Sequence, residues 1–443
     1  MKITVIDRIC GGSKTQDMIA RIKESINSNS GDKFLYITPY LEQCHAIAGT
    51  TPISEKDERP QYDANGIIYE ENEFNLGCAK FKHPDNRNKD GVKQESLRRL
   101  MQKGENIVST HNLFLNMKLD TLSNAEDYTL CIDEALDVYD RCKIITQKHV
   151  KKLLRLRILY KKEDGITLGF DRKLFGDVLL LDENEDAVED TGYEELAVLC
   201  DNNQILLVND HVMVWEFSSE ILKKFKKVYI LTYLFEGREM SVYLKKHNIE
   251  YEVLRSGKGG KDISELVEIL YDDKLNSVGD GDYALSVTRT KVEKRERHPP
   301  ERERYESEEK FKKAVARYDN YLKSLSKDTI SAYEINETLR KNLHTVFSTR
   351  WKAKAKDRYF TCLSENKEKI AGKNYKNDWL SYSIKATNLY KNTHHVAFLM
   401  NIFMQPTIKQ VCDSTDYKVD EDLVALSHLI QFVFRSALRV GEP

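Results

Sequence analysis

A turn of small residues near the start of the chain has the composition of a phosphate-binding loop. An apolar run of strand type comes first, and the turn then reads, in order, Gly11, Gly12, Ser13, Lys14 and Thr15. Small residues let backbone N–H groups approach an anion, a lysine can bridge terminal phosphates, and a threonine hydroxyl can ligate Mg²⁺. The turn therefore predicts a nucleotide site that uses ATP and Mg²⁺.

The turn departs from the usual phosphate-loop pattern at both of its glycine positions. Arg8 stands where the first glycine is expected, and Ser13 stands where the second is expected. A Gly-Gly-Ser-Lys-Thr string also occurs as an ordinary turn before a helix. The turn alone therefore leaves both interpretations open.

A pair of acids later in the chain would complete the same site. Asp133 and Glu134 follow the apolar run 130–132, and carboxylates at the carboxyl end of such a strand lie where α/β sheets bind ligands. Asp133 would hold Mg²⁺ through water, and Glu134 would orient or deprotonate the attacking water. Adjacent acids are also common in solvated loops. Together with Lys14 and Thr15, however, they predict hydrolysis of a nucleoside triphosphate.

Three polar residues near the end of the chain have helical spacing. Gln431, Arg435 and Arg439 are four residues apart, so a helix would place them on one face while the apolar residues between them pack on a sheet. Two permanently charged guanidinium groups suit the negative charge of a transferring phosphoryl group. The alternative is a surface helix with two ion-paired arginines.

The composition describes a globular chain without membrane spans. Its 443 residues predict two or three domains, and 40% are apolar and 32% charged. No apolar run reaches the roughly 18 residues of a membrane span, and Met1 leads directly into a strand, so we expect no signal peptide. Eight cysteines without a C-x-x-C pair indicate reduced thiols and a cytoplasmic location. A net charge of −2 requires any nucleic acid to bind in a local groove.

Strand-like runs alternate with helical stretches in the first third of the chain. This order predicts a parallel sheet with crossover helices, its strands lying at 3–6, 34–37, 107–109 and 130–132. The polar segment 50–92 is expected to be an exposed loop. A further buried-strand pattern lies at 228–234.

Two segments interrupt this alternation. Residues of about 145–217 read as a small accessory insertion, with a basic helix at 148–157, an acidic run at 182–190 and a hairpin turn at Asn209-Asp210. A second α/β pattern begins near 238, with strands expected at 249–253 and 283–287. Within it, the segment of about 289–350 is expected to be a charged helical insertion, its run at 289–320 being a solvated helix or linker.

Set in order, these pieces resemble superfamily 2 helicases, and most closely the DEAD/DEAH-box helicase-like proteins encoded by bacteriophages. The resemblance covers nearly the whole chain. Residues 11–15 resemble motif I, 36–41 motif Ia, 96–114 the next block, 133–134 the first half of the DEAD/DEAH box, 231–235 motif III, 385–390 motif V and 431–439 motif VI. Two departures are the second half of the acidic box, at 135–136, and a motif VI that is one residue longer than usual.

The resemblance implies two RecA-like domains, about 1–235 and 238–443, with ATP in the cleft between them. It assigns phosphate binding to residues 11–15, magnesium to Thr15 and Asp133, and catalysis to Lys14, Glu134, Gln431, Arg435 and Arg439. A nucleic-acid groove would be lined by residue types that contact phosphates and sugars, namely Thr38, Pro39, Thr110, His111, Thr387 and Asn388. Related proteins continue after the arginine segment, so a further strand and helix are expected beyond Pro443.

The predicted function is therefore a nucleic-acid-dependent ATPase that acts as a helicase or translocase on DNA more than on RNA. It would work in the host cytoplasm with replication or recombination partners. One alternative is the motor subunit of a restriction enzyme or terminase, which moves on duplex DNA without separating the strands. Another is a binding module whose altered motif I no longer hydrolyses nucleotide.

Overall fold

The computed structural model describes residues 2–9, 14–48, 62–63, 66–67, 81–84, 92–179, 191–255, 264–276, 278, 299–302, 305, 307–324, 332–382 and 390–442. The chain divides into two compact units. Unit 1 comprises Met1–Lys261 and Phe403–Ser427, and unit 2 comprises Asp262–Ile402 and His428–Pro443.

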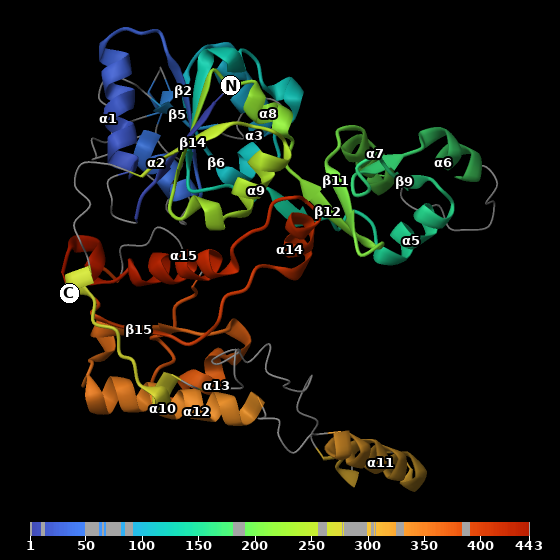
Figure 1. Ribbon diagram of the computed structural model, residues 1–443, viewed down its shortest axis with the longest axis vertical. Coiled ribbons are helices and arrows are strands. Elements are labelled where there is room, and N and C mark those ends of the chain that lie inside the picture. The colour runs from blue at the N-terminus through green and yellow to red at the C-terminus, as the bar shows by residue number, and fades with distance from the viewer. Residues whose placement is uncertain are drawn as a thin grey trace. The chain divides into compact units, whose positions relative to one another are not determined.

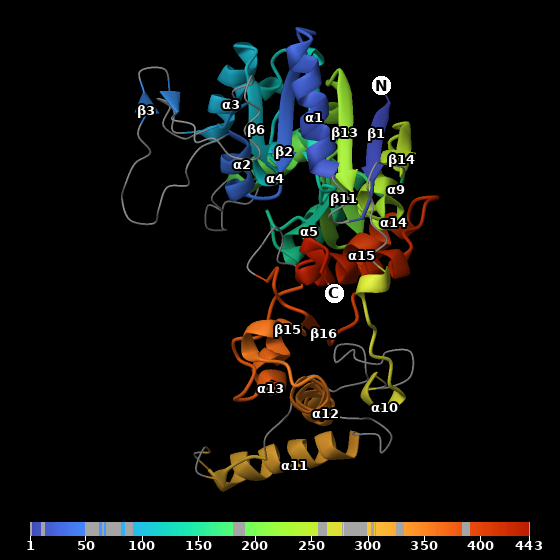
Figure 2. The same cartoon turned by 90° about the vertical axis from the view of Figure 1, so that its left-hand side faces the viewer.

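Unit 1 is built on a seven-stranded sheet in the order β14-β1-β13-β7-β2-β6-β5, and every strand pair in it is parallel. The strands are β1 (Ile3–Asp7), β2 (Lys33–Thr38), β5 (Phe81–Lys82), β6 (Asn106–Thr110), β7 (Tyr128–Asp133), β13 (Lys227–Thr232) and β14 (Tyr251–Leu254). Figure 2 shows several of them side by side. The predicted parallel α/β sheet is confirmed.

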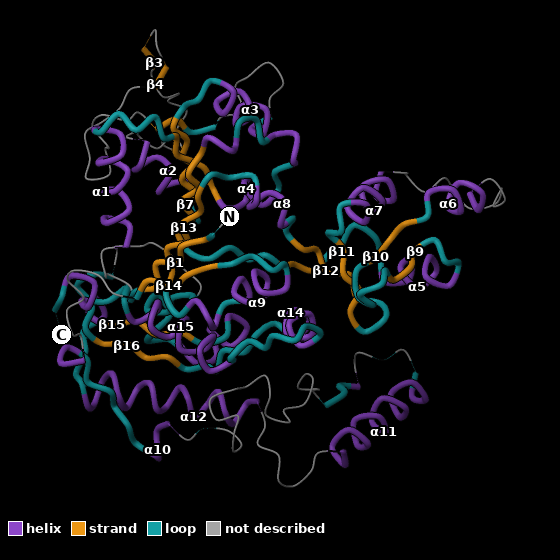
Figure 3. Tube along the Cα trace, turned by 45° about the horizontal axis from the view of Figure 1, so that its top comes forward, coloured by secondary structure: helices purple, strands orange, loops and turns teal. Residues whose placement is uncertain are grey.

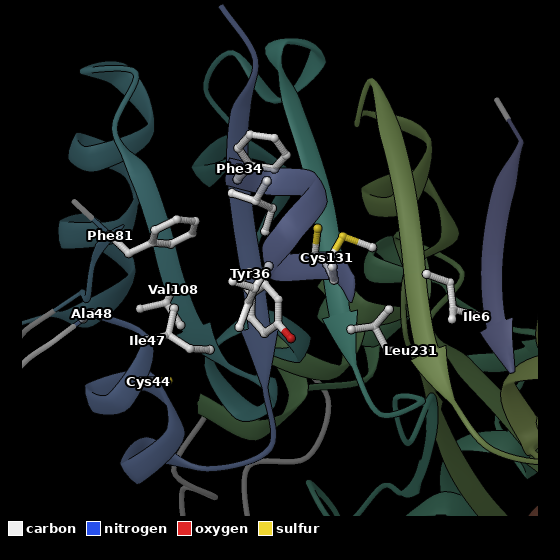
Figure 4. Close-up of a cluster of buried hydrophobic side chains, with 13 residues drawn as sticks. Ile6, Phe34, Tyr36, Cys44, Ile47, Ala48, Phe81, Val108, Cys131 and Leu231 are labelled. Carbon is white, nitrogen blue, oxygen red and sulfur yellow. The ribbon is translucent and has the colours of Figure 1, made fainter. Parts of the chain in front are cut away.

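Helices cover both faces of this sheet (Figure 1). One face carries α1 (Lys14–Asn27) and α2 (Leu41–Ala48), and the other carries α3 (Lys93–Gln102), α4 (His111–Leu115), α8 (Ser219–Lys223) and α9 (Glu239–Lys246). Because both faces are buried, the central strands are almost continuously apolar. Figure 4 shows the apolar cluster beneath α1 and α2, which includes Phe34, Tyr36 and Val108.

The strand expected to open the second domain belongs to the first sheet instead. β14 pairs with β1, with Tyr251 opposite Ile3 and Val253 opposite Val5. The chain reaches this edge through α9, whose residues Met240 to Leu244 are all buried. A helix buried this completely must lie against the sheet it leaves, and the next strand then joins the same sheet. The boundary expected at 238 therefore does not separate the units.

An accessory region, residues 139–217, lies between β7 and β13 in the chain. Its elements are β8 (Tyr139–Arg141), α5 (Gln147–Arg155), β9 (Leu159–Lys161), β10 (Leu168–Phe170), α6 (Arg172–Leu179), α7 (Thr191–Asp201), β11 (Ile205–Val208) and β12 (Val212–Glu216). The region has an apolar core of its own, and Figure 3 shows its elements α5, α6, α7 and β9 to β12 grouped together. The predicted hairpin is confirmed: β11 and β12 are antiparallel, and Asn209 and Asp210 have positive φ. The acidic run at 182–190 lies outside the described residues.

Unit 2 is built around α12 (Ala332–His344), which continues as a π-helix at Thr345–Arg350. Its buried residues Ile335, Leu339 and Leu343 are four apart and pack in the core of the unit. An apolar stripe of this kind belongs to a core helix, so residues 332–350 are not the charged insertion that the composition suggested. β15 (Arg358–Thr361) and β16 (His395–Phe398) are parallel. The strand expected at 283–287 lies outside the described residues.

The remaining described helices complete the two units. In unit 1, α14 (Pro406–Asp413) packs on α9 and on the accessory strands. The boundary between the units falls within α15 (Glu421–Val433). The remaining described α-helices of unit 2 are α10 (Asp273–Asn276), α11 (Glu308–Ser324) and α13 (Lys367–Ala371). No described helix combines the length and apolar composition needed to cross a membrane.

Candidate nucleotide site in unit 1

The strand order creates a binding position at the carboxyl ends of β1, β13 and β7. The chain leaves β1 through α1 and passes β13 and β7 to reach β2, whereas it leaves β13 through α9 and passes β1 to reach β14. Connections from two neighbouring strands thus depart in opposite directions. Such a topological switch point is where open α/β sheets bind ligands. The amino end of α1, which attracts anions, lies at this position.

Lys14 is the first residue of α1, and only 7% of its surface is exposed. Its Nζ atom donates hydrogen bonds to the carbonyl of Arg8 at 2.7 Å and to that of Ile9 at 3.4 Å. The ammonium group is thereby held against the backbone that directly follows β1. Gly11, Gly12 and Ser13 lie outside the described residues.

Arg8, which stands at the first glycine position, contacts both β13 and α1. Its backbone N–H donates to the carbonyl of Thr232 at 3.0 Å, and its guanidinium forms an ion pair with Asp17 of α1. Only 11% of the Arg8 side chain is exposed. The arginine therefore ties the end of β1 to the first turn of α1.

Four side chains from three separate segments meet at Asp133. Burial raises the pKa of Asp133 to about 7, and the charge of Glu134 adds to the increase. The charge of Lys14 and hydrogen bonding by the Tyr36 and Thr15 hydroxyls act in the opposite direction. The Tyr36 hydroxyl lies close to Asp133 and Thr15 but makes no hydrogen bond of regular geometry. The structure therefore brings together the predicted phosphate-binding and acidic elements.

Glu134 has a backbone conformation that is rare for a side-chain-bearing residue. Its φ is 67°, and its N–H donates to the carbonyl of Leu231 at 2.8 Å. A residue other than glycine in this left-handed region carries strain of about 1–3 kcal/mol. The chain therefore leaves the strand direction immediately after Asp133.

The residues predicted to line a nucleic-acid groove mostly make internal contacts. Thr38 is fully buried and donates a hydrogen bond to Gln43. Thr110 caps α4 by accepting a hydrogen bond from the N–H of Leu113 at 3.3 Å, and His111 Nε2 lies 2.8 Å from the carbonyl oxygen of Asp133. His111 thus supports the acidic strand end. Pro39 is half-buried, and Thr387 and Asn388 lie outside the described residues.

The predicted arginine helix is wrong in its geometry. α15 ends at Val433, and Ser436 is extended with ψ −169°, so Gln431, Arg435 and Arg439 do not share a helical face. Residues 434–438, which directly follow α15, are all buried. The three residues lie in unit 2.

The two arginines differ in their surroundings. Arg435 is 4% exposed, its guanidinium lies 5.8 Å from the centre of the Phe432 ring, and it donates to the carbonyl of Tyr382 at 3.3 Å. Arg439 is exposed, and Gln431 is partly buried. Arg435 is therefore part of the packing of unit 2, whereas Arg439 is accessible to a ligand.

Two residues of the site were not predicted from the sequence as members of it. Tyr36 is one, and Figure 4 shows its ring in the apolar cluster with the hydroxyl directed toward β7. Asp7 is the other: its carboxylate accepts hydrogen bonds from the N–H groups of Leu234 at 2.7 Å and Phe235 at 3.3 Å. Asp7 fixes the turn that follows β13. The sequence signal for Asp7 was a polar residue at the end of an apolar strand.

The raised pKa of Asp133 predicts a pH-dependent stability. The folded value is about 7 against an ordinary value of 3.8, so the native state binds more protons than the unfolded state between these values. The contribution of Asp133 to stability should therefore be most favourable at acidic pH and fall as pH rises to 7. Asp133→Asn removes this loss and should be more stable than the wild type at pH 8 by about 2–4 kcal/mol.

The measurement is denaturant unfolding of both proteins at pH 4 and pH 8 in metal-free buffer. Asp127→Asn, which removes an exposed carboxylate just before the same strand, is the matched control and should follow the wild type. If Asp133→Asn gains no stability over the wild type between the two pH values, Asp133 titrates as an ordinary surface acid.

Comparison with known proteins supports the description of the fold and of the C-terminal part. Residues 305–443 match the family described as the YonV C-terminal Rossmann-like domain. The protein is thus an α/β protein that combines a large parallel sheet with a Rossmann-like domain at its C-terminal end.

A full-length relative extends this similarity to the whole chain. The chain is similar to the SPbeta prophage-derived uncharacterized protein YonV of Bacillus subtilis (strain 168), with 26% identity over 464 aligned residues that span 100% of this chain and 94% of that protein. No solved structure matches the chain. The prophage-derived relative agrees with the bacteriophage origin that the sequence resemblance implied.

Proposed function

We propose that the protein is a Mg²⁺-dependent ATPase that works as a superfamily 2 DNA helicase or translocase, with unit 1 as its RecA-like nucleotide-binding part. The observation that carries the proposal is the convergence of Lys14, Thr15 and Asp133 at a topological switch point. A lysine, a hydroxyl and a carboxylate at the amino end of a helix are what a metal-bound triphosphate requires.

Each side chain has a distinct role in this proposal. Lys14 neutralises and orients the terminal phosphates, and Thr15 and Asp133 offer oxygen ligands to the metal. Few protein ligands suit Mg²⁺, which keeps several waters and also binds substrate phosphates. Mg²⁺, when bound, would neutralise charge that develops on the transferring phosphoryl group. Glu134 orients the attacking water and accepts its proton.

The nucleic-acid part of the proposal rests on two further supports. One is the ordered series of helicase-like motifs in the sequence. The other is the accessory region, which enters six residues after Asp133 and returns to β13, so that both of its connections lead to strands of the nucleotide site. Of the two arginines, Arg439 is exposed, whereas Arg435 is packed within unit 2.

The test is phosphate release from ATP, measured with and without Mg²⁺ and with and without single-stranded DNA. Wild-type protein should require Mg²⁺ and be stimulated by DNA. Lys14→Ala should weaken nucleotide binding by about 10- to 100-fold, because it removes charge-assisted hydrogen bonds of about 1.5–3 kcal/mol. It should also lower turnover by about 10²-fold or more.

Lys23→Ala, on the same helix α1, is the matched control and should behave as wild type. Absence of ATP binding and hydrolysis under every condition would overturn the proposal. If ATP is hydrolysed, unwinding of a forked duplex, compared with displacement of a third strand from a triplex, would distinguish a helicase from a duplex translocase.

A further inference from the structure

The accessory region has a strongly uneven distribution of charge. Residues 141–162 contain nine Lys and Arg residues and no Asp or Glu, whereas residues 182–190 contain six acids. The chain as a whole has a net charge of −2, so this acid-free segment is a local exception. It comprises the end of β8, all of α5 and all of β9.

Helix α5 presents this charge on a single face. Lys148, Lys151 and Arg155 are exposed and spaced i, i+3 and i+7, so they follow one side of the helix. The opposite side, with Val150 and Leu153, is buried in the core of the accessory region. A basic amphipathic helix can also bind membranes, but that mode inserts the apolar face. Here that face is already occupied.

The cations of this face are not neutralised within the described part of the chain. There, Lys148, Lys151 and Arg155 form no ion pair, and neither do Arg141 or Lys143 beside the start of the helix. At that start lies a hollow of about 600 Å³, whose lining includes Arg141, Lys143, His149 and His211 and, among the residues that the structure describes, no acid. The positive surface therefore continues from the helix into a concavity.

We infer that α5 and this hollow form a nucleic-acid-binding element that holds the sugar-phosphate backbone, with Lys148, Lys151 and Arg155 contacting successive phosphates. Flexible cationic side chains along a helix contact phosphates without reading bases, so binding should be independent of sequence. The inference rests on the proposed nucleic-acid-dependent ATPase and adds where that nucleic acid is held. It places the contact in the segment that joins the acidic strand end β7 to β13.

The experiment compares the full-length wild type with the triple variant Lys148→Ala/Lys151→Ala/Arg155→Ala by fluorescence anisotropy, using labelled single-stranded and duplex DNA at several salt concentrations. The variant should bind about 10- to 100-fold more weakly at moderate salt. Its slope of log K against log salt should be shallower by about 2 to 3, because each lost phosphate contact removes roughly 0.7–0.9. Its DNA-independent ATP hydrolysis should equal that of the wild type.

The matched control Lys103→Ala/Lys224→Ala/Lys227→Ala removes three exposed charges elsewhere in unit 1 and should bind like the wild type. Equal weakening in both variants, or no weakening in the α5 variant, would overturn the inference. Unchanged DNA binding with lower stability would show that the basic face is neutralised by acids of the chain itself. If the wild type hydrolyses no ATP, the proposed ATPase activity is wrong, and the DNA-binding result for α5 is judged separately.

Discussion

Glu134→Gln should leave nucleotide binding nearly intact and reduce turnover by about 10²- to 10⁴-fold, the usual contribution of a general base. The amide has the size of the carboxylate but cannot accept the proton of the attacking water. In the proposed site, Lys14, Thr15 and Asp133 would still hold the phosphates and the metal. A fluorescent ATP analogue measures binding, and phosphate release in a single turnover measures the chemical step.

Glu126→Gln is a suitable control for this substitution, since Glu126 is an exposed acid on the segment leading into β7. It should change neither binding nor turnover. If Glu134→Gln lowers binding and turnover by the same factor, the side chain contributes to holding the nucleotide rather than to activating water. The strained φ of 67° at Glu134 would then have to be explained by phosphate or metal binding.

Glu216→Ala should destabilise the protein by about 3–5 kcal/mol, because it removes the buried carboxylate and leaves the largely covered ammonium of Lys246 without its partner. Glu216 lies on β12 with 3% of its side chain exposed, and Lys246 of α9 donates to both of its carboxylate oxygens at 2.7 and 2.9 Å. His247 Nε2 lies 3.2 Å from the same carboxylate. Burial would raise the pKa of Glu216, but His247 and Lys246 hold it below its usual value.

This cluster joins the accessory region to the core of unit 1, so its loss should be seen by urea unfolding and by proteolysis within the accessory region. Glu220→Ala, which breaks the exposed pair with Lys223, should cost less than about 1 kcal/mol. The double substitution Glu216→Leu/Lys246→Met should recover most of the lost stability, since an apolar pair of similar volume can replace a buried ion pair. Failure to recover would assign the loss to packing rather than to the unpaired charge.

The two halves of the candidate site differ in how far the sequence could predict them. Lys14, Thr15, Asp133 and Glu134 were identified because each follows an apolar strand, and parallel strands end at the same edge of a sheet. Their proximity was then confirmed by the shared surroundings of Asp133. The four-residue spacing of Gln431, Arg435 and Arg439 predicts one helical face, but α15 ends at Val433 and the extended backbone of Ser436 interrupts the segment, which spacing alone does not indicate.

The sequence by itself determined the local elements: the buried strands, the small-residue turn, the hairpin at Asn209-Asp210 and the unusually basic segment 141–162. These depend on side-chain type and short spacing, which any stretch of chain carries with it. Only the tertiary structure decided that β13 lies between β1 and β7 and that β14 extends the same sheet. It also placed the Tyr36 hydroxyl near Asp133, and it placed the His111 ring against the backbone carbonyl of Asp133. Strand order and such contacts arise from packing between residues far apart in the chain, which short-range patterns do not record.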